Sequence, residues 1–559
     1  MNLRIKFFFL LLFIFFGLVA VKLFYWQVLS ADSLGALAQN QSQTSLTVPA
    51  SRGRIFASDG SPMVLNKKAY GVYIEPKKIT DLSKVESVLS EALNIPISTI
   101  SASLDNKSLV WVPIAHKVDE GPVESIKKFD LNGVDFLSEQ KRYYPEGSMS
   151  AHLLGFVGKD ANGKDKGYFG LEGYYDEQLR GRDGMIVQDQ DAQGNPILSG
   201  ERQVIPAQDG RDLTLYLDKT IQFIAQTKLK EGIELYGAKG GSVIIMDPNT
   251  GGILAMSSYP SYGPADFYNY PTQYYKNPAV ASFYEPGSTF KVLVMSAAIN
   301  EGKLTADTLY DESGPVEIGG YTINTWNRQY HGKITMTQIL EYSSNVGMVF
   351  VEEQLDKMVF LNYLKNLGIG STTGIDLQEE SSPDLRPADK WYPIDFATAS
   401  FGQGVAVTPL QMVTAVSAIA NGGRLMEPHV VKNISTDEGS QIEIAPKVVR
   451  TVFSKMTTDV VKEMMVEAVD KGETKNLKPA GFRIAGKTGT AQVPISGHYD
   501  SSKTIASFVG FAPVDNPKFV MLVVLDEPTA SQWGSETAAP VFFSIAKQLF
   551  SYLKISPSD

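Results

Sequence analysis

The stretch Tyr284-Glu-Pro-Gly-Ser-Thr-Phe-Lys291 joins a Tyr- and Pro-rich loop to an apolar run. A Pro-Gly pair is typical of a turn, and a serine just ahead of a periodic apolar segment is typical of a helix start. We therefore expect a helix over residues 288–300. Ser288 and Lys291 are three positions apart, so they share one face of that helix. A hydroxyl nucleophile and an amine base are thus predicted to lie side by side.

The Ser-x-x-Lys spacing alone selects little, because the chain contains it at four further places. These are Ser125/Lys128, Ser138/Lys141, Ser544/Lys547 and Ser551/Lys554. Only Ser288 follows a Pro-Gly turn and opens an apolar run, which favours it as the reactive copy. The alternative is that Ser288 is only a helix N-cap and Lys291 a solvated surface charge.

Two further short strings lie downstream. Ser343-Ser-Asn345 stands between helix-like stretches at 336–342 and 346–355, where these residues also serve as caps or turns. Lys487-Thr-Gly-Thr490 lies within residues 483–492, which we predict to be a strand with a close approach at its glycine, or else an edge-strand turn. The order of the three strings is that of the serine acyl-transfer enzymes that penicillin inactivates.

The chain resembles the class B penicillin-binding proteins, which are membrane-anchored D,D-transpeptidases of bacterial cell-wall synthesis. Motifs in both halves carry the resemblance. They are Arg52-Gly-Arg-Ile55, Ser58-Asp-Gly60, Arg142-Tyr-Tyr-Pro-Glu-Gly147, Ala151-His-Leu-Leu-Gly155, Gly170-Leu-Glu172, Gly240-Gly-Ser-Val-Ile-Ile-Met-Asp-Pro248, Ser400-Phe-Gly-Gln-Gly404, Thr408-Pro-Leu-Gln411 and Ala420-Asn-Gly-Gly423. Ser344 departs from the Ser-Asp-Asn form of the middle string. The Ser-Ser-Asn form is similar to that of division-type and sporulation-type members.

The resemblance implies an α+β fold, with a mixed pedestal module and a serine β-lactamase-like transpeptidase domain. The expected parts are a cytoplasmic stub at 1–6, a transmembrane anchor at 7–26, a non-catalytic pedestal for dimerisation or partner binding at 27–215, and the penicillin-binding transpeptidase domain at 216–559. The order of elements supports the last part. Strands at 242–256, helices within 288–421 and strands from 484 onward suggest an antiparallel sheet covered by helices.

The N-terminal segment predicts a membrane anchor. Residues 7–26 are apolar apart from one lysine, and as a helix they span about 30 Å, enough to cross a bilayer. Basic residues precede the run, which predicts a cytoplasmic N-terminus and an extracytoplasmic catalytic domain. The alternative is a signal peptide cleaved near Ala36-Leu-Ala38, which lies farther from the apolar run than a cleavage site normally does.

The composition argues against several other classes of protein and of binding site. The chain has 51 Lys and Arg against 61 Asp and Glu, a net charge of −10, which argues against a general nucleic-acid binder. It has no cysteine, so disulfides, thiol chemistry and cysteine-ligated metals are excluded. Its five histidines are scattered without a metal-ligand spacing, so neither a metal nor a cofactor is expected.

The resemblance also assigns the catalytic roles. Ser288 would attack the D-Ala-D-Ala bond of a stem peptide and release D-Ala, and Lys291 would take its proton. Lys291 needs a lowered pKa for this, which burial and the nearby Lys487 would supply. Asn345 would hold the Lys291 amine, and Ser343 would relay the proton to the leaving amine.

Substrate binding is implied in the same way. The backbone N–H groups of Ser288 and Thr490 would form the oxyanion hole. The substrate carboxylate would be bound by Lys487, Thr488, Gly489 and Thr490.

The implied partners are peptidoglycan stem peptides, β-lactams, the lipid bilayer of the bacterial inner membrane, and a glycan polymerase of the shape, elongation, division and sporulation (SEDS) family. No nucleic acid is expected. A septal role is favoured by the Ser-Ser-Asn string. The alternatives are an elongation-type cross-linker, a D,D-carboxypeptidase or β-lactamase that hands the acyl group to water, and a non-catalytic wall-assembly scaffold or β-lactam sensor.

Overall fold

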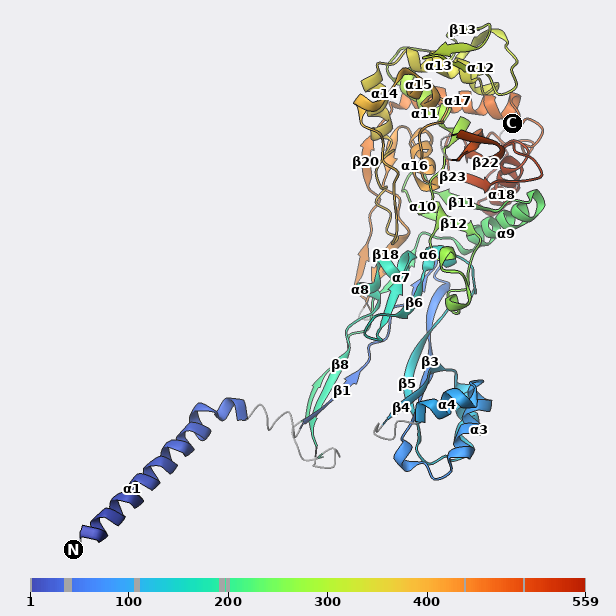
Figure 1. Cartoon of the computed structure of the whole chain (residues 1–559). Helices are drawn as coiled ribbons and strands as arrows, with labels where there is room; N and C mark the ends of the chain where they lie inside the picture. Colours follow the sequence, from blue (N-terminus) through green and yellow to red (C-terminus); the bar gives the residue numbers. More distant parts are fainter. Residues whose placement is uncertain are drawn as a thin grey trace. The chain divides into compact units, whose positions relative to one another are not determined.

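The structure is a computed structural model, and it describes residues 3–34, 43–104, 111–190, 197, 202–436, 439–495 and 498–557. The chain forms two compact units (Figure 1). The first unit is Met1–Arg52 with Arg180–Gly210, and the second is Gly53–Leu179 with Arg211–Asp559.

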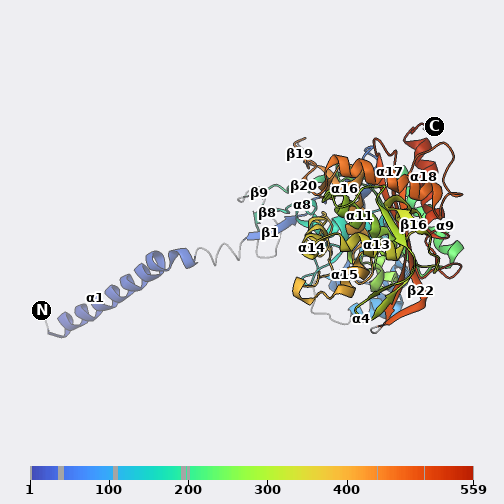
Figure 2. The same cartoon turned by 90° about the horizontal axis from the view of Figure 1, so that it is seen from above.

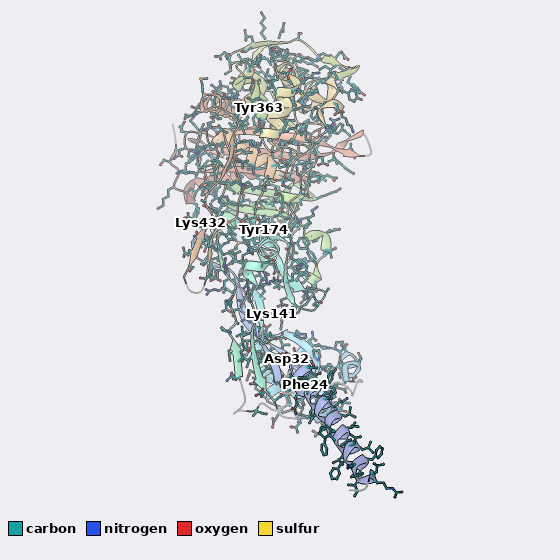
Figure 3. All side chains as sticks on the ribbon, turned by 90° about the vertical axis from the view of Figure 1, so that its left-hand side faces the viewer. Phe24, Asp32, Lys141, Tyr174, Tyr363 and Lys432 are labelled. Atoms are coloured by element: carbon teal, nitrogen blue, oxygen red, sulfur yellow. The ribbon has the colours of Figure 1, made fainter. Side chains whose placement is uncertain are left out.

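The first unit begins with a long apolar helix. Helix α1 (Leu3–Phe24) continues into a π-helical turn at Tyr25–Leu29, so it extends beyond both predicted ends of the anchor. None of its side chains is buried, and Figure 3 shows them projecting around the helix as far as Phe24. Among the described residues it is the one helix long and apolar enough to cross a membrane. The alternative cleavage site at 36–38 lies outside the described residues.

The rest of the first unit is a small antiparallel sheet. Its strands are β1 (Gln43–Val48), β8 (Gly184–Asp189) and β9 (Arg202–Ile205), in the order β1-β8-β9. Strand β1 pairs with β8 across more than a hundred positions of sequence, from Gln43 opposite Asp189 to Val48 opposite Gly184.

A second sheet, with three helices beside it, forms the pedestal of the second unit. Its main strands are β3 (Pro62–Ile74), β4 (Val112–Val118) and β5 (Val134–Tyr143), and its helices are α3 (Leu82–Leu93), α4 (Ile97–Leu104) and α5 (Glu120–Lys127). The first of these helices, α3, packs against the sheet. Asp81 caps it, and Val85 and Leu89, one turn apart, bury their side chains against Val72 and Ile74 of β3.

A segment from the C-terminal half returns to this sheet, which the sequence did not predict. Strand β10 (Asp212–Leu215) lies between β2 (Ile55–Phe56) and β18 (Val431–Ser435), with β19 (Gln441–Glu443) beyond. The pairing of β10 with β2 is parallel and joins distant segments, so no local turn signal announces it.

The C-terminal half contains the predicted antiparallel sheet covered by helices, and that prediction is confirmed. The strand order is β12-β11-β23-β22-β21, and every neighbouring pair is antiparallel. The strands are β11 (Gly240–Met246), β12 (Ile253–Tyr259), β21 (Ala485–Ile495), β22 (His498–Ala512) and β23 (Phe519–Asp526).

The sheet separates two hydrophobic cores. Strand β11 is buried along its whole length, because its alternating side chains enter different cores. Val243 and Ile245 pack with helices α9 (Lys219–Tyr236) and α18 (Ala538–Tyr552). Ile244 and Met246 pack in the other core, which contains α16 (Pro409–Ala420), a helix buried all round (Figures 1 and 2).

The aromatic residues of α18 serve mainly as packing groups. Phe542, Phe543 and Phe550 are buried in the core between α18 and the sheet. Tyr552 stays exposed, and its hydroxyl donates a hydrogen bond to Asp218 Oδ2 over 2.9 Å.

Two predicted helical regions are subdivided. The region 288–300 begins as a 3-10 turn, η5 (Gly287–Phe290), and becomes α-helical only in α11 (Lys291–Asn300). Residues 332–366, within the predicted helical region 288–421, form one strand and three helices. They are β16 (Gly332–Thr335), α12 (Met336–Glu341), α13 (Asn345–Glu353) and α14 (Lys357–Asn366).

Candidate active site

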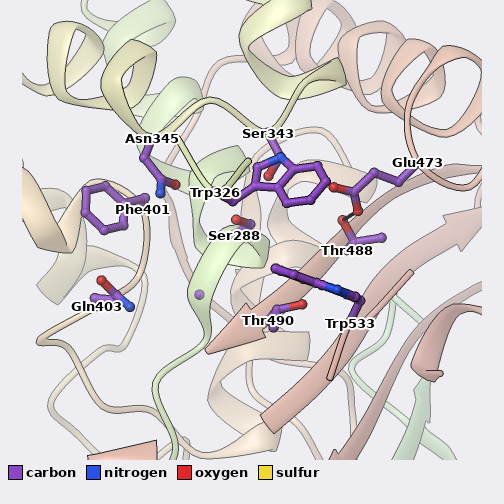
Figure 4. Close-up of a pocket in the computed structure, with 11 residues that line it drawn as sticks. Ser288, Trp326, Ser343, Asn345, Phe401, Gln403, Glu473, Thr488, Thr490 and Trp533 are labelled. Atoms are coloured by element: carbon purple, nitrogen blue, oxygen red, sulfur yellow. Dashed lines mark hydrogen bonds between the residues drawn. The ribbon is translucent and has the colours of Figure 1, made fainter. Parts of the chain in front are cut away.

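The turn that carries Ser288 is wedged between two other backbone segments. Gly287 has φ +56°, and its N–H donates to the carbonyl of Gly402 over 3.1 Å. A Cβ atom at this position would lie 2.8 Å from the carbonyl oxygen of Thr490, so only glycine fits. The Thr289 hydroxyl closes the turn by donating to Pro286 O over 2.7 Å. Ser288 is therefore held on a rigid turn at the edge of a cleft (Figure 4).

The alternative roles of Ser288 and Lys291 as cap and surface charge are wrong. The N-cap positions of η5 and α11 are Pro286 and Phe290. Lys291 is completely buried rather than solvated. A buried lysine is rare unless its amine is bonded or functional.

The second string surrounds the amine of this lysine. Lys291 Nζ donates to the carbonyl oxygen of Ser343 over 2.6 Å and to Asn345 Oδ1 over 2.8 Å, and it lies 3.3 Å from Ser343 Oγ. Burial, followed by the positive charge of Lys487, holds the pKa of Lys291 well below its usual range. Burial and the neighbouring cation therefore both disfavour the charged form of this amine.

The middle serine of this string has a different role. Ser344 is the N-cap of α13, and its hydroxyl oxygen accepts from the N–H of Gly347 over 2.9 Å. The capping interpretation therefore holds for Ser344, while its two neighbours contact the lysine. Ser343 adopts φ +54°, a left-handed conformation that directs both its carbonyl and its side chain to one amine.

The third string lies on β21, the edge strand of the sheet, beside the turn that carries Ser288. A Cβ atom at Gly489 would lie 2.8 Å from Thr289 Cγ2, so the predicted close approach at this glycine is confirmed. Lys487 is buried, and its amine donates to Thr488 Oγ1 over 3.1 Å. Burial lowers the pKa of Lys487.

The three strings line one cleft of about 480 Å³, part of it open to solvent. Its lining residues are Gly287, Ser288, Trp326, Ser343, Asn345, Phe401, Gln403, Glu473, Thr488, Thr490 and Trp533. Figure 4 shows Ser288 between Ser343 and Asn345 on one side and the β21 residues Thr488 and Thr490 on the other.

The cleft also contains residues that the sequence did not identify. Trp326 and Trp533 meet edge to face, with ring centroids 5.1 Å apart. Glu473, which follows helix α17 (Lys455–Lys471), accepts a hydrogen bond from Thr488 Oγ1 over 3.2 Å. Tryptophan is scarce in the chain, so its rarity was a weak signal of a function for Trp326 and Trp533. No local sequence pattern distinguished Glu473 from other acidic residues.

The walls of the cleft are bound to one another. Thr490 Oγ1 accepts from the N–H of Gly534, next to Trp533, over 2.9 Å.

Within the described residues, no group of three or more His, Asp or Glu side chains could hold a metal ion. The chemistry that this geometry offers is acyl transfer to a serine, with a buried amine as base.

Two family patterns match the chain. The pattern described as the penicillin binding protein transpeptidase domain matches residues 241–547, and the penicillin-binding protein dimerisation domain matches residues 47–215. The first contains all three strings, and the second contains most of the pedestal.

Individual proteins are similar over nearly the whole chain. Stage V sporulation protein D of Bacillus subtilis is 34% identical over 564 residues, covering 99% of this chain and 86% of that protein. Peptidoglycan D,D-transpeptidase FtsI of Escherichia coli K12 is 30% identical over 541 residues, covering 95% and 88%.

Solved structures agree in fold. Penicillin binding protein 2X from Streptococcus thermophilus gives a TM-score of 0.75 at 26% identity, covering 92% of this chain and 81% of that one. A peptidoglycan synthetase from Bifidobacterium adolescentis gives 0.74 at 27% identity, covering 92% and 98%. The chain therefore belongs to the class B penicillin-binding proteins and is a penicillin-binding D,D-transpeptidase.

Proposed function

We propose that the chain cross-links peptidoglycan stem peptides through an acyl-enzyme on Ser288. The observation that carries the proposal is the environment of Lys291, a fully buried amine surrounded by hydrogen-bond acceptors from Ser343 and Asn345. Burial disfavours the ammonium form, so a base is available beside the serine without a histidine.

The first half-reaction releases D-Ala. Ser288 Oγ forms a bond to the carbonyl carbon of the D-Ala-D-Ala peptide, and its proton passes to Lys291 Nζ. The C–N bond then breaks, and the departing amine takes a proton through the Ser343 hydroxyl. Backbone N–H groups of Ser288 and Thr490 stabilise the developing oxyanion, an effect of about 3 kcal/mol per preorganised donor.

The second half-reaction forms the cross-link. The side-chain amine of a neighbouring stem peptide attacks the acyl carbon, its proton returns through the same groups, and Ser288 is released. The terminal carboxylate of the donor is bound by Lys487, Thr488, Gly489 and Thr490, which would place the peptide bond ahead of the C-terminal residue at Ser288. A β-lactam imitates the donor and leaves a stable acyl-enzyme.

The chain is anchored in the bacterial inner membrane through α1, with a cytoplasmic N-terminus and an extracytoplasmic catalytic domain. The length and apolarity of Leu3–Leu29 support this placement, as do the basic residues ahead of the apolar run. The anchor and the pedestal bind a SEDS-family glycan polymerase, which supplies the strands to be cross-linked.

The cross-linking serves septal rather than sidewall synthesis. The similarity to stage V sporulation protein D and to FtsI supports this role, as does the Ser-Ser-Asn string. A fluorescent fusion should collect at septa, and a uniform sidewall signal would count against the septal role.

Supplying a pentapeptide donor with and without an amine acceptor tests the cross-linking itself. The expected product is an acceptor-linked peptide, with one D-Ala released per link. Release of D-Ala without any linked product, at saturating acceptor, would identify a carboxypeptidase instead.

A further inference from the structure

A buried acidic side chain outside the three strings supports the loop that carries Ser343 and Asn345. Glu312, at the end of β13 (Leu309–Glu312), is completely buried, and its carboxylate accepts a hydrogen bond from the Ser344 hydroxyl. The same carboxylate accepts from the N–H of His331 over 3.0 Å and lies 2.9 Å from His331 Nδ1. A buried carboxylate that accepts several hydrogen bonds has a fixed position. Breaking any of these bonds would leave a buried polar group unpaired, which costs free energy.

The supported loop is also held at its preceding residue. The ring of His331 stacks on the ring of Tyr342, with centroids 4.1 Å apart and an angle of 16°. The carbonyl of Tyr342 accepts from Trp326 Nε1 over 3.2 Å. Glu312 and His331 therefore fix the loop at Tyr342 and Ser344. The residues beside these two, Ser343 and Asn345, accept the hydrogen bonds of the Lys291 amine.

The identity of the middle serine fits this arrangement. A hydroxyl at position 344 can donate to Glu312 while its oxygen accepts from Gly347. An aspartate there would place a second carboxylate against Glu312, and two such groups repel unless they share a proton. Ser344 and Glu312 thus form a matched pair.

We propose that Glu312 is a positioning residue for acylation, acting through Ser344 to fix the two residues that hold the Lys291 amine. The proposal rests on the proposed function, in which Lys291 is the base. It assigns to Glu312 no contact with the substrate.

The charge of Glu312 provides a readout that a merely structural role would not change. The charged groups facing Lys291 are Lys487 from β21, Glu473 from the segment after α17, and Glu312 from β13. Glu312 and Glu473 raise the pKa of Lys291 against the larger effects of burial and Lys487. Neutralising Glu312 should therefore lower that pKa further, and the acid limb of the acylation rate should move to lower pH.

The test compares Glu312→Gln with the wild type as full-length proteins in detergent, using a fluorescent penicillin and a series of pH values. At the plateau the second-order rate constant should fall about 10-fold, the usual effect of weakening a charged hydrogen bond, and the acid limb should shift to lower pH. Glu317→Gln, an exposed carboxylate on the next strand in sequence, β14 (Val316–Ile318), is the matched control and should behave as wild type. A Glu312→Gln protein with an unchanged rate and pH profile would overturn the proposal.

Variants of Ser344 test whether Glu312 acts on the acylation rate through Ser344. Their result does not depend on how well Glu312→Gln folds. Ser344→Ala should lower the plateau rate to a similar extent, and Glu312→Gln/Ser344→Ala should be little worse than either single change. Ser344→Asp should acylate poorly alone and recover when combined with Glu312→Gln. Multiplicative losses in the first pair, or wild-type activity of Ser344→Asp, would refute the proposal. Failure of the proposed cross-linking would be distinct, since it would appear as release of D-Ala without a linked product in the donor–acceptor assay, whatever the labelling rates of these variants.

Discussion

Lys291 Nζ donates a hydrogen bond to Asn345 Oδ1 over 2.8 Å, which joins the first and second strings into one unit around a buried amine. Asn345 is in turn held by donating through Nδ2 to the carbonyl of Asn324 over 3.2 Å. The side chain therefore has a fixed orientation, with its oxygen toward the amine. In the proposed mechanism the reactivity of Ser288 depends on this arrangement, because the Lys291 amine acts there as the base.

Replacing Asn345 should change both the rate and its pH dependence. In Asn345→Ala the amine loses an acceptor, and the acylation rate should fall about 10-fold, as expected for one buried hydrogen bond. In Asn345→Asp a negative charge beside the amine should raise the pKa of Lys291, so the acid limb should move to higher pH. Asn366→Ala on the exposed end of α14 is the control. An Asn345→Asp profile at or below the wild-type pH would contradict the account.

Replacing Lys487, the cation beside Lys291, should also shift the acid limb of the acylation rate. Lys487 lowers the pKa of Lys291, so Lys487→Gln should raise that pKa and reduce the fraction of neutral base near neutral pH. The pH profile of acylation should move to higher pH, and binding of the β-lactam carboxylate should weaken. Lys475→Gln, at an exposed position beyond α17, should leave the profile unchanged. A shift of Lys487→Gln to lower pH would be incompatible with Lys291 as the base.

Glu473 places a negative charge where the substrate carboxylate is expected. Its carboxylate accepts from Thr488 Oγ1, a hydroxyl proposed to bind that carboxylate. Glu473→Gln should tighten the initial non-covalent complex with an anionic penicillin about 2- to 5-fold, the scale of exposed charge interactions. The dissociation constant from pre-steady-state acylation measures this effect, with Glu467→Gln on α17 as the control. Weaker binding in Glu473→Gln would show that Glu473 assists the ligand instead.

A buried contact joins the pedestal to the transpeptidase half and should contribute to stability. Tyr175 OH donates to Asp376 Oδ2 over 2.9 Å, and Asp376 also accepts from the N–H groups of Val430 and Val431. Tyr175→Phe should cost about 1 kcal/mol, whereas Asp376→Ala removes the acceptor of three buried donors and should cost about 2–5 kcal/mol.

Thermal unfolding measures this effect. The neighbouring Tyr174→Phe is the control, because Tyr174 is about half exposed. The folded fraction of each variant should still acylate at the wild-type rate. Equal unfolding temperatures for Asp376→Ala and the wild type would exclude the predicted contribution of this contact.

Much of the fold was predictable because its signals are local. The continuous apolar run of β11 and the one-turn spacing of Val85 and Leu89 depend only on neighbouring residues. The Pro-Gly turn before Ser288 likewise distinguished it from the other Ser-x-x-Lys copies. The predicted α-helix was wrong in its first turn, which is a 3-10 turn. This turn packs against Gly402 and Thr490, which are distant in sequence.

The remaining features depend on contacts between distant segments. The return of β18 to the pedestal sheet is specified by pairing with β10, more than two hundred positions away. Glu312 and Glu473 reach the site from β13 and from the end of α17, and each looks like an ordinary surface carboxylate in sequence. Only the tertiary structure shows that one of them is buried and that the other faces Thr488.

Labelling with a fluorescent penicillin tests the central claim, that Ser288 is the nucleophile, most directly. The wild type should form a covalent adduct that survives denaturation, and peptide mapping should place it on Ser288. Ser288→Ala should remain unlabelled while keeping the wild-type unfolding temperature, because the side chain makes no structural bond that the turn requires. Stoichiometric labelling of a folded Ser288→Ala protein would contradict the account.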